Sequence, residues 1–526
     1  MKPSHYRDQF IALQQAAADK DALSHLARQI AGSFMDHYYQ DGHYDEAYID
    51  LLCEMAALES GTAWSQAVSS AFFSTIIEEL CDDYEDFQFE VYNRVMSQVI
   101  SYCRNLPAAQ KLDQYLSRFH LRCAEDLSGR ARNIHTRNFH FHPNTKTIKK
   151  IYILSRITIG ADVAIVSVII QRLSVLFPDA QIILLGSLKL QDVFGGNPRL
   201  LIREVPYSRS GSLLDRLESW CRLVDLLDNQ TTSDKDAALW IDPDSRLTQL
   251  GILPICKEHH YLYFNSHTDW LSSRNACMAE HANAWMDSVF GRPGFCYPRV
   301  WLKPDLLSQT HTLIHSLRQS GCQSITTINF GVGGNPRKRL GLDFEKKLIS
   351  ELLKQPQSVV ILDQGFGAEE TACTRQIIAD MQNRGYPVHQ SRFEQTAPDN
   401  FSHGLLAIEC TIGQISALIS GSDEYIGYDS ACQHIAAASS IPTITIFAGS
   451  NNPRFIRRWS ACSNTSCKVI HVDTLGHPDT LNPDDIISRI MEERQPALPR
   501  AESQIKIIDV EHPKQKTKKQ TLKKQT

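Results

Sequence analysis

Several features that mark secreted, membrane or metal-binding proteins are missing from this sequence. None of its 14 cysteines forms a C-x-x-C pair, so we expect reduced thiols and no metal site. No apolar run approaches the length that spans a bilayer, and the N-terminal stretch MKPSHYRDQFIALQQ lacks the apolar core of a signal peptide. A net charge of −5 gives no argument for binding to nucleic acid. We therefore expect a cytoplasmic protein without a nucleic-acid partner.

The length and the composition predict a globular protein of several domains. A chain of 526 residues exceeds one ordinary domain, and 42% hydrophobic with 21% charged residues is typical of globular proteins. Near the N-terminus, apolar residues recur at intervals of three and four, as at Ile49, Leu52, Cys53, Met55 and Ala56. We expect residues 1–145 to form an all-helical domain that packs on the rest of the chain or binds a partner.

From Lys149 onward, strand-like runs alternate with helical patterns. An apolar run at 149–156 is followed by a helical stripe from Asp162 to Phe177 and by a second apolar run at 181–187. Further strand-like runs lie at 200–205, 238–241 and 261–264. This alternation predicts a doubly wound parallel sheet in residues 146–303. The Gly- and Pro-rich stretch GRPGFCYPRVWLKP (291–304) is typical of a connection between lobes.

A second lobe is expected in residues 304–498. Helices are predicted at 305–319, 411–420 and 483–493, and strands at 324–330, 358–363 and 468–472. The α/β fold class is therefore two doubly wound, Rossmann-like lobes behind an all-α domain. The remaining residues, 499–526, carry six lysines after Pro513 and no acid there, which predicts a disordered basic tail. Such a tail either solubilises the protein or adds weak attraction to an anionic membrane surface.

The stretch EYIGYDSACQHIAAASSIPTITIF (424–447) carries the most informative pattern. A strand at 424–428 is followed by Asp429 and Ser430, which are residue types that cap helices, and then by a small-residue helix at 433–440. Pro442 ends this helix before a strand at 443–447. The N-terminus of a helix that follows a strand suits a diphosphate without any metal, because free N–H groups and the helix dipole attract anions. An ordinary capped helix is the alternative.

This stretch, extended to Trp459, resembles the nucleotide-sugar motif of the heptosyltransferase family (glycosyltransferase family 9). Asp429, Ser430 and His434 stand at the matching positions, and Ala431 stands where the family usually has Gly. The opening segment from Arg156 also resembles that family's first motif. The resemblance places Asp162 on the family's catalytic Asp; Ala161 holds the usual Gly position and Gly160 lies one place early. The alternative for Asp162 is that it only caps its helix.

Two further loops are similar to the same family. In GVGGNPRKRLGLDFEKKL, Gly333 and Gly334 allow close backbone approach, and Lys338 falls on the family's phosphate-contacting Lys. A solvated basic loop is the alternative. In QGFGAEE, Glu369 is the best match to the acidic residue that holds the donor's ribose, with Glu370 as the alternative. Both glutamates would also suit a helix start.

The resemblance implies an inverting, metal-independent glycosyltransferase of two-lobed (GT-B) build that needs no cofactor. Its donor would be a nucleotide-diphosphate sugar, with ADP-heptose as the family's default. Its acceptor would be a glycan, such as lipopolysaccharide core, a lipid-linked glycan or a protein. Asp162 would act as the base, and Lys338, Ser430 and the helix N–H groups would stabilise the leaving diphosphate. An inactive sugar-nucleotide-binding or scaffold protein and an epimerase of similar build are the rival hypotheses.

Overall fold

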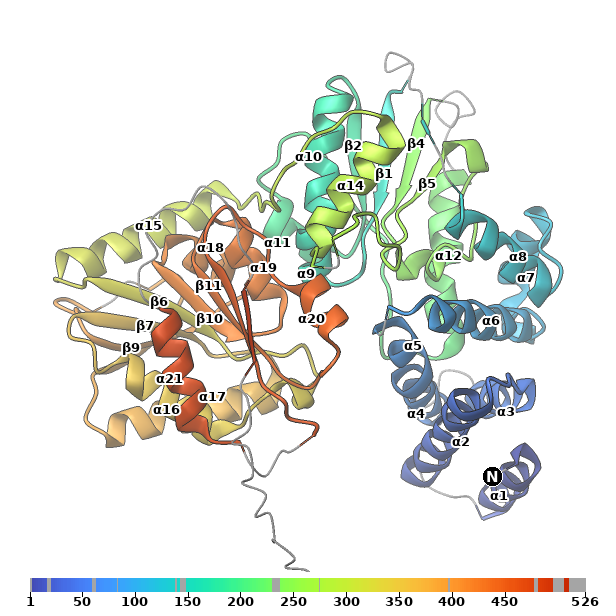
Figure 1. The fold of residues 1–526 in the computed structure, drawn as a ribbon, viewed down its shortest axis with the longest axis horizontal. Coiled ribbons are helices and arrows are strands. Elements are labelled where there is room, and N and C mark those ends of the chain that lie inside the picture. The colour runs from blue at the N-terminus through green and yellow to red at the C-terminus, as the bar shows by residue number, and fades with distance from the viewer. Residues whose placement is uncertain are drawn as a thin grey trace, which may run out of the picture.

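The computed structural model describes residues 2–16, 20–58, 63–82, 84–137, 140–141, 148–228, 237–273, 275–395, 398–476, 481–494 and 506–509. A helical region comes first and two α/β lobes follow it (Figure 1). The helical region contains α1 (Pro3–Gln15), α2 (Lys20–Asp41), α3 (Glu46–Ala57), α4 (Ala63–Phe72), α5 (Glu78–Asp82), α6 (Asp86–Cys103), α7 (Gln110–Arg118) and α8 (Ala124–His135). Its predicted all-helical character is confirmed in the described residues.

The first lobe, here the N-lobe, is built on a parallel sheet of five strands in the order β3-β2-β1-β4-β5. All five strands lie where the sequence predicted them. They are β1 (Lys150–Leu154), β2 (Gln181–Gly186), β3 (Leu200–Glu204), β4 (Ala238–Asp242) and β5 (Tyr261–Tyr263). The helices are α9 (Ile159–Ala161), α10 (Ser167–Leu176), α11 (Gln191–Phe194), α12 (Leu213–Asp228) and α14 (Met278–Phe290).

Strand β1 shows how the alternation of side chains divides the core. Ile151 and Ile153 pack with α10 and α14 on one face of the sheet, whereas Tyr152 and Leu154 pack toward α12 on the other (Figure 1). The second group belongs to the same apolar cluster as the core of the helical region. The helical region therefore shares a core with one face of the N-lobe and is not an independent appendage.

The second lobe, here the C-lobe, contains a parallel sheet of eight strands in the order β13-β12-β11-β10-β6-β7-β9-β8. The strands are β6 (Ser324–Asn329), β7 (Ser358–Asp363), β8 (Val388–Arg392), β9 (Gly404–Glu409), β10 (Glu424–Tyr428), β11 (Thr443–Phe447), β12 (Cys467–His471) and β13 (Lys506–Asp509). The helices are α15 (Pro304–Gln319), α16 (Leu342–Leu352), α17 (Gly367–Asn383), α18 (Ile412–Gly421), α19 (Ala431–Ala438), α20 (Pro453–Trp459) and α21 (Pro483–Glu493). Two doubly wound lobes behind a helical region confirm the predicted fold class.

Two details differ from the sequence-based expectation. The helix from Ile159 to Leu176 is long and apolar enough to cross a membrane by length and composition, although 78% of it is buried within the protein. Burial against β1 and α14 accounts for its apolar character, because a helix covered on most sides needs few polar residues. Strand β13 lies within the stretch predicted to be a disordered tail, and it pairs in parallel with β12. The remainder of 499–526 lies outside the described residues.

Candidate active site between the lobes

In each sheet the chain reverses its direction of winding next to the first strand. β10 pairs with β6 in the C-lobe, and β4 pairs with β1 in the N-lobe, so each pair marks a topological switch point. Open parallel sheets bind ligands at the carboxyl ends of such strands. The loops after β6, β10 and β1 carry Lys338, Asp429 and Asp162, which are three of the residues predicted to form the site.

Lys338 and Asp429 meet across the C-lobe switch point. The Lys338 ammonium forms an ion pair with Asp429 Oδ2, with 23% and 9% of the two side chains exposed. Gln433 Nε2 donates to the other carboxylate oxygen of Asp429 at 2.6 Å. The neighbouring Arg339 pairs instead with the buried Glu345, so Lys338 is the basic residue of this loop that reaches the switch point.

The loop that carries Lys338 depends on glycine conformation. Gly333 has a φ of 61° and Gly334 a φ of 85°, and both lie in the left-handed region that other residues rarely adopt. Nothing lies within 4 Å of the position that a Cβ would occupy on either residue. The two glycines are therefore required for backbone conformation, and no other described part of the protein fills the space beside them.

Helix α19 begins at Ala431, directly behind Asp429. Ser430 occupies the N-cap position, but its side chain makes no capping hydrogen bond. The N–H groups of the first turn therefore have no side-chain cap, as an anion-binding helix tip requires. His434 is buried one turn further on, and burial lowers its pKa to about 4. Its ring lies 6.1 Å from that of Trp459, so His434 packs behind the turn as a neutral side chain.

The two lobes touch at this helix tip. A Cβ on Gly160 would lie 3.1 Å from Ala431 Cα and 3.2 Å from His434 Cδ2, so a larger residue would fit only if these neighbours shifted. Gly160 is the second residue of α9, so the starts of α9 and α19 face each other. The structure thus brings the helix that follows β1, which carries Asp162, into contact with α19, which begins directly behind Asp429.

Asp162 itself is almost fully buried, with 1% of its surface exposed. It accepts hydrogen bonds from Ser155 Oγ at 2.6 Å and from the Arg156 backbone N–H at 2.7 Å. These bonds hold the loop after β1, in which Ile157 adopts a φ of 74°, a strained value for a β-branched residue. Burial raises the pKa of Asp162 to about 7, because the charged form is poorly solvated there.

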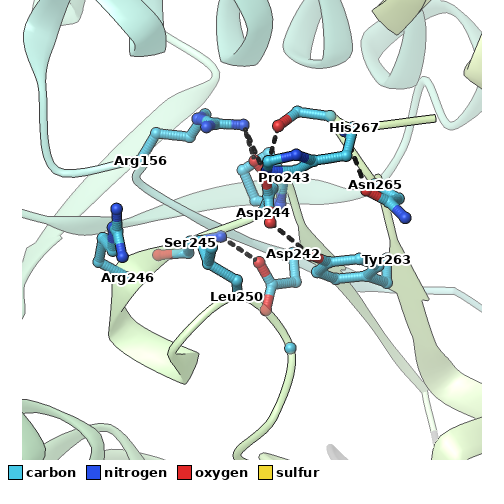
Figure 2. Close-up of polar contacts among 12 residues, drawn as sticks. Arg156, Asp242, Pro243, Asp244, Ser245, Arg246, Leu250, Tyr263, Asn265 and His267 are labelled. Atoms are coloured by element: carbon cyan, nitrogen blue, oxygen red, sulfur yellow. Dashed lines mark hydrogen bonds and ion pairs between the residues drawn. The ribbon is translucent and has the colours of Figure 1, made fainter. Parts of the chain in front are cut away.

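A polar network that the sequence did not reveal lies beside this loop (Figure 2). Arg156 Nη1 donates to the Pro243 carbonyl at 3.0 Å and pairs with Asp244 Oδ2 at 3.4 Å. Tyr263 and Ser266 also donate to the Asp244 carboxylate. Burial opposes ionisation of Asp244, but the Arg156 charge, His267 and the hydrogen bonds from Ser266 and Tyr263 together outweigh burial and lower the pKa. The one hint of this network in the sequence is the Asp-Pro-Asp run (242–244), which begins at the last residue of β4.

The loop after β7 separates the two glutamates that the sequence offered. Glu369 is exposed. Glu370 lies between the loops after β6 and β7, where its Oε2 accepts the Phe366 N–H at 2.9 Å. A Cβ on Gly331 would lie 3.4 Å from both Glu370 carboxylate oxygens. The geometry therefore favours Glu370, the alternative, over Glu369 as a residue that faces the crevice.

Helix α20 joins the two lobes and the helical region. Arg458 is buried and donates to the carbonyls of Ser266 and His267 in the N-lobe, the latter at 3.3 Å. Its guanidinium also lies 4.9 Å from the centroid of the Tyr84 ring, which belongs to the α5–α6 turn. One turn earlier, Arg454 pairs with Glu85 of the same turn at 3.4 Å. Three parts of the chain thus meet at α20.

Replacing Arg458 with alanine should lower the free energy of unfolding by about 2–4 kcal/mol, because two buried carbonyls lose a charged donor. Urea unfolding followed by tryptophan fluorescence measures this loss. Arg457→Ala, one residue earlier and only half-buried, is the matched control and should change stability by less than about 0.5 kcal/mol. Equal midpoints for the two variants would contradict the assignment of Arg458 as the bridging residue.

Comparison with known proteins supports the relationship that the motifs suggested. Residues 349–478 match the family model described as Glycosyltransferase family 9 (heptosyltransferase). This segment includes Glu370, Asp429 and His434, and it begins after Asp162 and Lys338 in the chain. Among proteins with curated functions, none matches this sequence significantly.

Solved structures similar to this chain include three bacterial proteins. The glycosyl transferase family 9 protein from Veillonella parvula is 12% identical, with a TM-score of 0.44 over 66% of this chain and 89% of that one. The E. coli ADP-heptose lps heptosyltransferase II is 13% identical, with a TM-score of 0.43 over 65% and 98%. The E. coli heptosyltransferase WaaC with ADP is 10% identical, with a TM-score of 0.41 over 65% and 99%.

The protein thus combines two α/β lobes, each with a topological switch point, and residues 349–478 of the C-lobe match the glycosyltransferase family 9 model. The resemblance predicted from the sequence motifs is confirmed for residues 349–478, which are similar to glycosyltransferase family 9. The helical region, α1 to α8, is an addition in front of the two lobes.

Proposed function

We propose that this protein transfers a sugar from a nucleotide-diphosphate donor to an acceptor hydroxyl, with inversion and without a metal ion. The family description names heptosyl transfer, which makes ADP-heptose the first donor to test. The observation that carries the proposal is the Lys338–Asp429 ion pair beside the uncapped start of α19. This arrangement provides an ammonium group and fixed N–H donors where a departing diphosphate needs positive charge.

Residues of both lobes take part in the chemical step. The acceptor oxygen attacks the anomeric carbon, the bond from that carbon to the diphosphate oxygen breaks, and the acceptor proton passes to Asp162. Lys338, Ser430 and the first N–H groups of α19 take up the growing charge on the nucleoside diphosphate. A pKa raised to about 7 suits Asp162 to this role, since a base works best near the ambient pH.

Positive charge from the protein replaces a metal ion in this scheme. The start of α19 contributes roughly half an elementary charge, and Lys338 contributes a full one. Gly333 and Gly334 let the backbone of the loop after β6 approach the donor. Glu370, rather than the exposed Glu369, would accept hydrogen bonds from the ribose hydroxyls, because its carboxylate lies between two loops of the crevice.

A thermal-shift screen against ADP, UDP, GDP and CDP, with and without attached sugars, tests the donor class. At a concentration 100 times the dissociation constant, a ligand of the native state adds about 2.7 kcal/mol of stability. We expect a rise in the unfolding midpoint with ADP-heptose and with ADP, and no loss of this rise in EDTA. A panel in which no nucleotide raises the midpoint would rule out the proposed donor class.

One observation favours a second candidate, a protein that binds a sugar nucleotide without transferring the sugar. Ala431 carries a methyl group at the helix tip, and Gly160 packs directly against it. The diphosphate must compete with this contact between the lobes. Labelled ADP-heptose separates the two functions, because an enzyme releases ADP over time and a binding protein returns the donor intact. The acceptor, a cytoplasmic location and membrane contact through the basic tail stay predictions.

A further inference from the structure

Phe366 stands out among the apolar side chains because 87% of its surface is exposed. It lies in the loop after β7, at the N-cap of α17, and not on an outer surface remote from the switch point. Gly365 and Gly367 flank it with φ values of 79° and 85°. Because both values favour glycine, the backbone of this turn is built to hold the phenyl ring away from the core. An exposed ring held in this way is available to a flat ligand.

The turn also connects Phe366 to the proposed ribose site. The Phe366 N–H donates to Glu370 Oε2 at 2.9 Å, so the ring and this carboxylate belong to one hydrogen-bonded turn. A Cβ on Gly365 would lie 3.0 Å from the same oxygen, which keeps the carboxylate close to the turn. In a nucleotide, the base is bonded to C1′ of the ribose, and C1′ is adjacent to the carbon that bears the 2′-hydroxyl. A ribose held by Glu370 therefore brings its base to the neighbourhood of Phe366.

One side chain of the N-lobe lies near the same ring. Lys189 lies in a single 3₁₀ turn after β2, and its ammonium is 5.6 Å from the centroid of the Phe366 ring. This contact shows that a face of the ring is open toward the N-lobe and attracts a positive group. It also places Phe366 at the gap between the lobes, where a donor would lie.

We propose that Phe366 is the stacking platform for the base of the donor nucleotide. The assignment rests on the proposed function, since it requires that a nucleoside diphosphate binds with its ribose at Glu370. It adds a residue that selects for a nucleobase through its π-face, whereas Lys338 and the α19 tip interact only with the diphosphate. Stacking of a base on an aromatic side chain tolerates every base, so Phe366 supplies affinity more than base identity.

Isothermal titration with two probes tests the platform in the full chain. The probes are the tightest of the four nucleoside diphosphates, with ADP expected, and inorganic pyrophosphate, which has neither base nor ribose. Phe366→Ala should raise the dissociation constant of the nucleotide about tenfold and leave that of pyrophosphate within about twofold. Val175→Ala, which removes an equally exposed apolar side chain from the N-lobe, is the matched control and should change neither constant.

A second variant gives a spectroscopic signal. Phe366→Trp should bind the nucleotide at least as tightly as the wild type, and its added fluorescence should be quenched by the nucleotide but not by pyrophosphate. Unchanged nucleotide binding by Phe366→Ala overturns the assignment, and so does equal weakening of both probes, which would mark a disturbed loop. If the wild type binds pyrophosphate but no nucleotide, or binds neither probe, the proposed function itself fails.

Discussion

Replacing Lys338 with alanine should lower the rate of ADP release from ADP-heptose by about 10²- to 10³-fold, the usual cost of losing one preorganised charge at a leaving group. The ammonium lies beside Asp429 and the start of α19, where the departing diphosphate gains negative charge. Asp429 keeps the hydrogen bond from Gln433 after the substitution, so we expect the fold to persist. Initial rates and far-UV circular dichroism measure the two effects separately.

A matched control for this variant is Lys347→Ala. Lys347 is also a half-exposed lysine in an ion pair, with Asp484 at 2.9 Å, but it lies on α16 away from the switch point. Its removal should leave the rate within about twofold, as is normal for a surface ion pair. A Lys338→Ala enzyme that releases ADP at the rate of the Lys347→Ala enzyme would refute the role of Lys338.

Asp162→Asn should lower the rate of transfer by about 10²- to 10⁴-fold, because the proposed base is lost. An asparagine can still accept from the Arg156 N–H and donate to Ser155 Oγ, so the loop after β1 should keep its conformation. Ser155→Ala is the control, since it disturbs the same loop and retains the carboxylate. It should lower the rate less than about tenfold. Wild-type turnover by Asp162→Asn would place the base elsewhere.

Stability as a function of pH gives a second readout for Asp162. Its pKa is raised from the ordinary value near 4 to about 7 by burial, so the folded state binds this proton more tightly than the unfolded state. The contribution of Asp162 to the free energy of unfolding is therefore greatest at low pH and falls as pH rises from about 4 to about 7. Asp162→Asn removes this dependence, and its stability relative to the wild type should increase between pH 5 and pH 8. Parallel curves would contradict the pKa shift.

The positions of strands could be predicted from the sequence wherever an apolar run ends at a proline or at residues that cap a helix. The strand at 424–428, the Asp429–Ser430 turn and the strand at 443–447 lie where the pattern placed them, because Pro442 and the capping residues mark the boundaries locally. Strand β8 gave no such signal. Its sequence, VHQSR, is largely polar because it forms an edge of the sheet and faces solvent.

A residue of the candidate site could be predicted only where its position follows from the strand and loop that carry it. Lys338 and Asp429 follow strands at a switch point, so their meeting could be expected from topology. The choice between Glu369 and Glu370 depends on the rotation of α17, which no local pattern gives. The contacts of Arg458 with Ser266 and Tyr84 join segments that are hundreds of residues apart in sequence, and only the folded chain brings them together.

The contact of Gly160 with Ala431 and His434 has a kinetic consequence. If the diphosphate of a donor binds at the tip of α19, it takes the place of this contact, so we expect the two lobes to move apart when the donor binds. Because Arg454 and Arg458 also connect to Glu85 and Tyr84, this separation must break or carry along contacts with the helical region. A molecule that binds α5 and α6 and holds these contacts in place would then slow the binding of the donor.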